Sequence, residues 1–157
     1  FGTNFSLGGT PVNKTSIETK PMVARINPAT GLPLWVKVID EAAATHIYSN
    51  NIAVNNTTGD VYVTGSAIAA GNLSFAGNSY PYIGGNDIFV AHYNSAGTEL
   101  SADVYGSAAD DWANDIAVDN TGNISITEAS FTILPVLFFI SNKTLTSAIP
   151  SSVLLIG

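Results

Sequence analysis

The stretch NNIAVNNTTGDVYVTGS, Asn50 to Ser66, returns about sixty residues later as NDIAVDNTGNISITEA, Asn114 to Ala129. Each copy has an apolar run, a polar segment that contains glycine, and a second run in which apolar and polar residues alternate. Such alternation is typical of a strand with one buried face, while Asn, Asp and Gly favour tight hairpin turns. The sequence therefore predicts a β-hairpin that occurs twice.

The repeated unit is longer than this hairpin. Val23 to Gly31 (VARINPATG) resembles Val90 to Gly97 (VAHYNSAG), and the copies differ in length only between the matched segments. Changes of length confined to turns are typical of stacked supersecondary units, because each unit needs its neighbour to cover its apolar face. Four strands are predicted in the complete copy, at roughly 50–55, 60–67, 87–94 and 99–106.

From Asp87 to Gly122 the chain reads DIFVAHYNSAG, then YGS, then DDWANDIAVDNTG. This run resembles the bacterial SBBP-type β-propeller repeat, and the resemblance extends over residues 20–129. It implies a propeller blade and an extracellular or cell-surface location, because members of that family are typically secreted or surface-anchored. It implies no catalytic residues.

A second resemblance is local. Val23 to Trp35 also looks like the repeat of quinoprotein propellers, whose units end in a Thr-Gly turn and a Trp. Ser101 stands at the equivalent of Trp35 in the next unit, so the Trp is not periodic.

The expected fold is all-β, a β-propeller segment of repeated four-stranded antiparallel blades. Propellers typically have four to eight blades, and this chain supplies about two and a half, which leaves the ring incomplete. One repeat region is expected over 1–157, with a partial blade at 1–40, a complete blade at 48–106 and a degenerate final blade with an apolar tail at 112–157. The start inside a blade, with neither an initiator Met nor a signal peptide, favours a fragment or a processed chain.

The apolar tail departs from the repeat. Phe131 to Ile140 is broken by Pro135 and is shorter than the ~20 residues that span a bilayer, so no membrane span is expected. Strands are expected around 136–141 and 152–156. They either complete the final blade or pair with an open sheet edge or with another copy of the chain.

Charge is distributed unevenly. The net charge is −7, and no Lys or Arg occurs between Lys37 and Lys143, a span that holds eleven acids. Nucleic acid and anionic membrane surfaces are therefore excluded as expected partners. The expected partners are further blades of the same polypeptide or other copies of the chain, with a carbohydrate or a protein as ligand. Cysteine is absent, which excludes disulfides and thiolate metal sites.

The acids cluster at Asp110, Asp111, Asp115 and Asp119. Asp110 and Asp111, with a loop carbonyl, are candidate ligands for Ca²⁺, the only cofactor considered, because hard cations bind several oxygens. The alternative is ordinary turn chemistry, and the preceding unit has His46 and Ile47 at these places. No nucleophile motif occurs, and no residue is assigned a catalytic role.

Aromatic residues and sequons supply the remaining candidate sites. Tyr48 and Trp112 are equivalent positions that either wedge between blades or stack on a sugar, and Tyr80 and Tyr82, in a long inserted loop, are further candidates for stacking. The Asn-x-Ser/Thr sequons are at Asn4, Asn13, Asn55, Asn56, Asn72, Asn123 and Asn142. Their number favours a glycosylated surface protein, although hairpin turns favour Asn and strands favour Thr in any case.

These features favour a non-catalytic, secreted or cell-surface repeat module that serves assembly or binds protein or carbohydrate. One alternative is a filament or sheath subunit whose apolar C-terminal strands complete a neighbour's sheet. The other is a propeller-type polysaccharide hydrolase or lyase that uses acids within 110–119.

Overall fold

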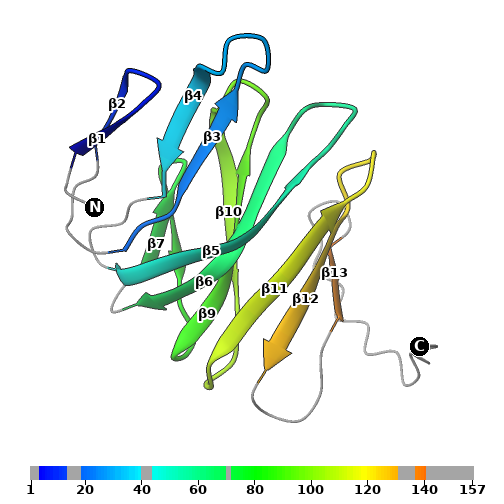
Figure 1. Cartoon of the computed structure of the whole chain (residues 1–157). Coiled ribbons are helices and arrows are strands. Elements are labelled where there is room, and N and C mark those ends of the chain that lie inside the picture. Colours follow the sequence, from blue (N-terminus) through cyan, green and yellow to red (C-terminus); the bar gives the residue numbers. More distant parts are fainter. Residues whose placement is uncertain (1–3, 14–18, 40–43, 70–71, 131–136, 141–157) are drawn as a thin grey trace.

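The computed structural model describes residues 4–13, 19–39, 44–69, 72–130 and 137–140. These residues form antiparallel β-sheets and contain no helix, which confirms the all-β prediction. In the described ranges the sheets stand beside one another and do not close into a ring (Figure 1). The strands are β1 (Asn4–Leu7), β2 (Thr10–Asn13), β3 (Met22–Ile26), β4 (Pro33–Val38), β5 (Ala44–Val54), β6 (Val61–Ala69), β7 (Asn72–Phe75), β8 (Asn78–Pro81), β9 (Asn86–Tyr93), β10 (Glu99–Tyr105), β11 (Asp111–Val118), β12 (Ile124–Ser130) and β13 (Leu137–Ile140).

The central sheet has the order β10-β9-β6-β5, and all its neighbouring strands are antiparallel. These are the four strands that the sequence predicts for the complete copy, although β5 begins at Ala44 rather than near residue 50. Strand β9 is buried on both faces, with only His92 partly exposed. Its unbroken apolar run therefore indicates a strand covered from two sides.

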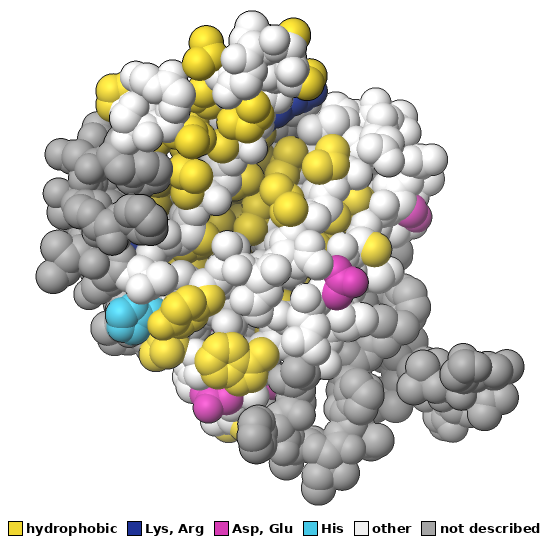
Figure 2. Space-filling model, viewed as in Figure 1, with side chains coloured by type: hydrophobic (Ala, Val, Ile, Leu, Met, Phe, Trp, Pro, Cys, Tyr) yellow, Lys and Arg dark blue, Asp and Glu magenta, His cyan; other side chains and the backbone are white. Residues whose placement is uncertain are grey.

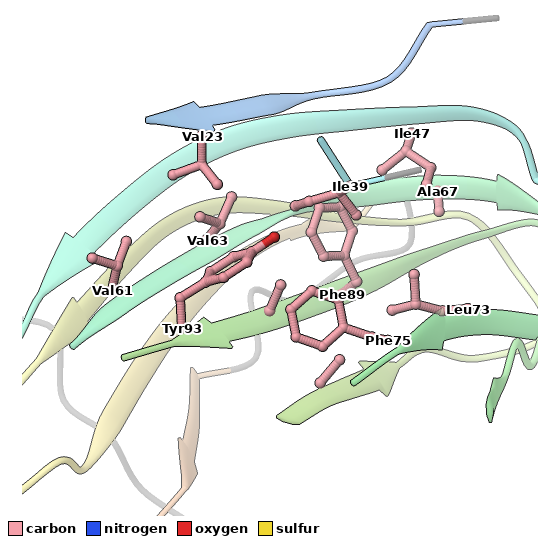
Figure 3. Close-up of a cluster of buried hydrophobic side chains, with 12 residues drawn as sticks. Val23, Ile39, Ile47, Val61, Val63, Ala67, Leu73, Phe75, Phe89 and Tyr93 are labelled. Carbon is pink, nitrogen blue, oxygen red and sulfur yellow. The ribbon is translucent and has the colours of Figure 1, made fainter. Parts of the chain in front are cut away.

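Two smaller sheets cover the two faces of the central sheet. One core cluster joins Val23 of β3 to Val63 and Phe89, with Tyr93 and Phe75 beside them (Figure 3). The other core cluster lies on the opposite face and joins β11 and β12 to β6 and β9, through Ile116, Ile126, Tyr62, Ile88 and Val90. The period-two alternation along β6 and β9 sends successive side chains into these two cores.

The third sheet, with the order β11-β12-β13, repeats the register of the central one. Val61 of β6 pairs with Tyr93 of β9, and the equivalent Ile124 of β12 pairs with Ile140 of β13. Both sheets also carry a register shift at the same place in their first strand, between Ser49 and Asn51 in β5 and between Ala113 and Asp115 in β11. The two copies of the repeat therefore share a β-bulge at the same position, and this bulge increases the local right-handed twist of the first strand in each sheet.

The segment between β6 and β9, which the sequence analysis interprets as a loop, contains a small hairpin of β7 and β8. Leu73 and Phe75 of this hairpin are buried in the core beside β9. Strands β1 and β2 form a similar hairpin near the start of the chain. Each of these hairpins precedes a longer strand pair, β3–β4 or β9–β10, so the two hairpins occupy the same place in two successive units.

Strand β3 is covered on only one side, although the apolar run Met22-Val23-Ala24 is typical of a strand that is covered on both sides. Val23 is buried, whereas Met22 and Ile26 on the other face are exposed, as is Leu34 of β4. Figure 2 shows hydrophobic side chains gathered over the β3–β4 hairpin and between it and β5. Among the described residues, β3 and β4 form a two-stranded sheet of their own.

Candidate functional site

The polar junction between the central and third sheets is the place where most of the buried acids meet. It is formed by residues 83–87, which lead into β9, and residues 106–111, which lead from β10 to β11. Asp87 Oδ2 accepts hydrogen bonds from Ile83 N at 2.8 Å and Gly84 N at 3.1 Å. Asp111 Oδ2 accepts one from Ser107 N at 2.6 Å. We call the carboxyls of Asp87, Asp111 and Glu128 the acidic junction.

Gly106 allows the first two of these carboxyls to approach each other. A Cβ at Gly106 would lie 1.8 Å from Asp87 Oδ1 and 3.2 Å from Asp111 Oδ2, so these two oxygens are at most 5.0 Å apart. Gly106 follows β10 directly opposite the start of β9, where any side chain would fill the space that Asp87 occupies. The glycine in Tyr-Gly-Ser therefore makes room for a buried carboxyl.

Glu128 completes the acidic junction from β12. It faces Ala113 across the β11–β12 pair, and its carboxyl is hydrogen-bonded to that of Asp111. Burial, the hydrogen bond to Asp111 and the charge of Asp111 raise the pKa of Glu128 from 4.5 to about 7. A hydrogen bond between two carboxyls needs a proton, so Glu128 donates to Asp111 when it is protonated.

Asp110 and Asp111, the predicted Ca²⁺ ligands, point to different partners. Asp110 Oδ1 accepts from Asn86 N at 2.8 Å and from Asn86 Nδ2 at 2.9 Å, whereas Asp111 turns to Ser107 and Glu128. Asp111 opens strand β11, and successive side chains at the start of a strand point to opposite sides. Among the described residues, no three acidic or histidine side chains are placed to hold one metal ion.

Asparagines of β5 and of the turn after it bind β11 and the turn that follows β11. Asn50 Nδ2 donates to Ala113 O, and Asn51 Nδ2 donates to Asp115 Oδ1 at 2.5 Å. Asn55 Nδ2 donates to Asp119 O at 3.0 Å. Asn51 and Asn55 thus contact their own equivalents in the third sheet, and we call these three bonds the asparagine ladder.

Asp115 and Asp119 are held by local hydrogen bonds as well. Asp115 Oδ1 also accepts from Ile116 N, and the Asp119 carboxyl accepts from both Thr121 and Asn123. Hydrogen bonds from the Thr121 hydroxyl, then from the Asn123 backbone and side chain, lower the pKa of Asp119 to about 2. The Asp115 carboxyl therefore belongs to the asparagine ladder, and the Asp119 carboxyl stabilises the hairpin turn that follows β11.

The four aromatic candidates are not brought together. Tyr48 is exposed on β5 and stacks on His46 with ring centroids 6.0 Å apart, and its equivalent Trp112 on β11 is partly buried. Tyr80 lies in β8, packs against the core and accepts a hydrogen bond from Ala102 N at 3.2 Å, and Tyr82 packs against the same core. Tyr80 and Tyr82 thus anchor the inserted hairpin, and Tyr48 is the exposed ring among the four.

The other histidine, His92, lies on the face of the central sheet that meets β11. Its ring stacks on Tyr62 with centroids 4.2 Å apart, and its Nε2 lies 3.4 Å from Asp60 Oδ2. Burial, then the charge of Asp60, raises the pKa of Tyr62. This group lies at the turn end of β6, away from the acidic junction at its other end.

The sequons differ in accessibility. Asn55 is only 3% exposed, and its Nδ2, the atom to which a glycan is attached, donates to Asp119 O. Its Oδ1 accepts from Thr57 N and Thr58 N, so the whole amide is held in place, which disfavours a glycan at Asn55. Asn56 and Asn72 are exposed and Asn123 is partly exposed. The side chains of Asn4 and Asn13, and all of Asn142, lie outside the described part of the chain.

Trp35, which has no equivalent in the next unit of the sequence, makes a contact between two sheets. Its Nε1 donates to Ser95 O at 3.1 Å, and Arg25 Nη1 donates to the same carbonyl at 2.7 Å. The Trp35 ring lies against Gly97 and stacks on Tyr93. Trp35 thus holds the β3–β4 hairpin to the β9–β10 turn of the next unit.

Comparison with known proteins gives no match, either to the model of any protein family or to any curated protein. Within the described ranges, no helix is long and apolar enough to cross a membrane.

Proposed function

We propose that the chain is a non-catalytic repeat module of a secreted or cell-surface protein. In this proposal it is a β-propeller segment of the SBBP kind that is completed by a further unit, either of the same polypeptide or of another copy. The proposal rests on the difference in exposure between two equivalent residues. Ile116 on β11 is 6% exposed, because the central sheet covers it, whereas its equivalent Ile52 on β5 is 50% exposed.

The open edge of β3 supports the same conclusion. Strand β9 pairs with β6 on one side and β10 on the other, but its equivalent β3 pairs only with β4 among the described residues. A free strand edge next to an apolar face favours the addition of another strand. A strand pair that follows the pattern of β5 and β6 would satisfy the edge of β3 and cover Ile52 and Val54.

The two alternative functions have less support. Strand β13 pairs with β12 of the same chain, so this part of the tail completes its own sheet rather than a neighbour's sheet, which weakens the filament alternative. The acids within 110–119 are held in structural hydrogen bonds, and Asp111 bonds directly to Glu128. A glycosidase pair instead needs carboxyls about 5–10 Å apart on either side of a substrate.

A binding role remains part of the proposal through Tyr48, which offers an exposed ring beside His46 for a carbohydrate or protein ligand. Glycans are proposed at the exposed sequons, Asn56 first among them.

The test is the mass of the native chain in solution, measured by light scattering over a range of concentrations. We expect self-association that is lost in the double variant Ile52→Thr/Val54→Thr, because Thr keeps the β-branched shape while it lowers the apolar area. Leu100→Thr, at an exposed apolar residue of β10, is the matched control and should associate like the native chain. If the 157-residue chain stays monomeric at all concentrations, completion by another copy is contradicted, and a monomer that cleaves polysaccharide contradicts the whole proposal.

A further inference from the structure

The acidic junction contains a buried oxygen that the protein itself does not satisfy. Asp87 is 0% exposed, and its Oδ1 has no hydrogen-bond partner in the described part of the chain. Asn86, 8% exposed, presents a second such oxygen, Oδ1. Buried carboxyl and amide oxygens are nearly always paired, since leaving one without a partner costs about 1–3 kcal/mol or more. Two unpaired oxygens in adjacent residues therefore point to a ligand that supplies positive charge.

The charge of the acidic junction also favours a bound cation. The N–H groups that donate to Asp87, Asp110 and Asp111 are neutral backbone or amide groups. No Lys or Arg occurs anywhere between Lys37 and Lys143. Several carboxyls are thus buried together without a fixed cation among their hydrogen-bond partners, an arrangement that is stable only when something neutralises it.

The repeat itself does not require these acids. At the equivalent places one unit earlier, Lys20 stands for Asp87, Ile47 for Asp111 and Gly65 for Glu128. Ile47 is fully buried in an apolar core there. An apolar side chain therefore fills this position in the same scaffold, and the acids at the second junction are an addition to it.

We propose that the acidic junction binds one Ca²⁺ ion, with Asp87 Oδ1 and the Asp111 carboxyl as its protein ligands. Ca²⁺ takes oxygens at about 2.3–2.6 Å, so two oxygens on one ion are at most about 5 Å apart. Asp87 Oδ1 and Asp111 Oδ2 meet this limit, since they are within 5.0 Å of each other. The remaining positions of the coordination shell are taken by water and backbone carbonyls, as Ca²⁺ readily accepts in irregular loops.

The experiment measures the thermal unfolding midpoint of the whole chain at pH 7.5 in EDTA and in millimolar CaCl₂. An ion present at about 100 times its Kd raises the midpoint by about 5–10 °C for a chain of this size. We expect this shift in the native chain and in Asp103→Asn, a control that changes an exposed carboxyl outside the acidic junction. The shift should vanish in Asp87→Asn, which keeps the size of the side chain. A native chain without a shift, or an equal shift in Asp87→Asn, overturns the proposal.

A second measurement locates the ion even if Asp87→Asn fails to fold. Tb³⁺ replaces Ca²⁺ and emits when a nearby Trp is excited. Trp112 adjoins the ligand Asp111, whereas Trp35 lies in the β3–β4 hairpin. Trp112→Phe should remove the Tb³⁺ emission and retain the Ca²⁺ shift, and Trp35→Phe should retain both. Emission that depends on Trp35, or that added Ca²⁺ does not reduce, places the ion elsewhere and overturns the proposal.

Discussion

A methyl group at Gly65 should separate the first two strands of the central sheet. Gly65 lies on β6 opposite Ser49 of β5, beside the bulge. A Cβ built there lies 1.8 Å from Tyr48 O and 2.8 Å from Ser49 Cα, both of which are backbone atoms. Because real Cβ contacts below 3.0 Å essentially never occur, Gly65→Ala forces the strands apart by about 1.2 Å, the difference between 3.0 and 1.8 Å.

The expected loss of stability follows from that displacement. It lengthens a cross-strand N···O distance of about 2.9 Å to about 4.1 Å, which is no longer a hydrogen bond. Two such bonds, lost where the strands are buried, cost about 1–3 kcal/mol each. We expect Gly65→Ala to lower the free energy of unfolding by ~2–6 kcal/mol, a large part of the ~5–15 kcal/mol typical of a domain. Without the contact, Ala in a strand would stabilise the protein by about 0.5–1 kcal/mol.

Urea unfolding followed by far-ultraviolet circular dichroism measures this difference. Gly77→Ala is the matched control, because a Cβ there meets nothing within 4 Å and only its φ of +76° opposes the substitution. That conformation costs about 1–2 kcal/mol for a residue with a side chain. If Gly65→Ala is as stable as Gly77→Ala, or more stable than the native chain, then the close approach of β5 and β6 at this point is refuted.

Three further predictions concern single side chains. Because the pKa of Glu128 is raised to about 7, the folded state binds a proton that the unfolded state has lost above pH 4.5, so stability should fall as pH rises from about 4.5 to 7 and then level off. Urea midpoints against pH test this, and Glu128→Gln should remove that slope. Trp35→Phe should cost about 1 kcal/mol through its lost bond to Ser95 O, read from the same unfolding curves, and no change would show that the bond is not formed in solution. Asn55→Ala should cost about 2–4 kcal/mol and Asn56→Ala almost nothing, while mass spectrometry of the chain from a glycosylating host should find sugar on Asn56 and none on Asn55.

The strands of the central sheet were predictable because each is long enough to show its period. In β6 and β9 the alternation of apolar side chains, together with the Gly-containing turns, is carried by neighbouring residues, so it can be recognised without any knowledge of distant contacts. The hairpin of β7 and β8 was missed because NLSF and NSYP are short and largely polar. What holds it in place is Leu73 and Phe75 in a core formed by other parts of the chain.

The acidic junction could not be predicted for a different reason. Asp87, Asp111 and Glu128 come from β9, β11 and β12, and no local pattern joins them. Sequence proximity instead suggested Asp110 with Asp111, which the pleat at the start of β11 sends to different partners. Trp35 was missed because its partner is the backbone carbonyl of Ser95, a group that every residue has and that no sequence pattern reveals.

In the asparagine ladder all the side-chain donors lie on the side of β5, and all the acceptors lie on the side of the third sheet. Asn51 and Asn55 donate from β5 to the third sheet, but their equivalents there are Asp115 and Asp119, which have no side-chain N–H to donate. The Asp119 carboxyl is also occupied by Thr121 and Asn123 of its own turn. A unit that followed the third sheet would need to supply the donors itself, whereas a unit that preceded the central sheet would meet an open β3 edge and the apolar side chains of β5. The two sides of the stack therefore differ among the described residues, with apolar side chains exposed on β5 and acidic side chains without N–H donors on the side of β11.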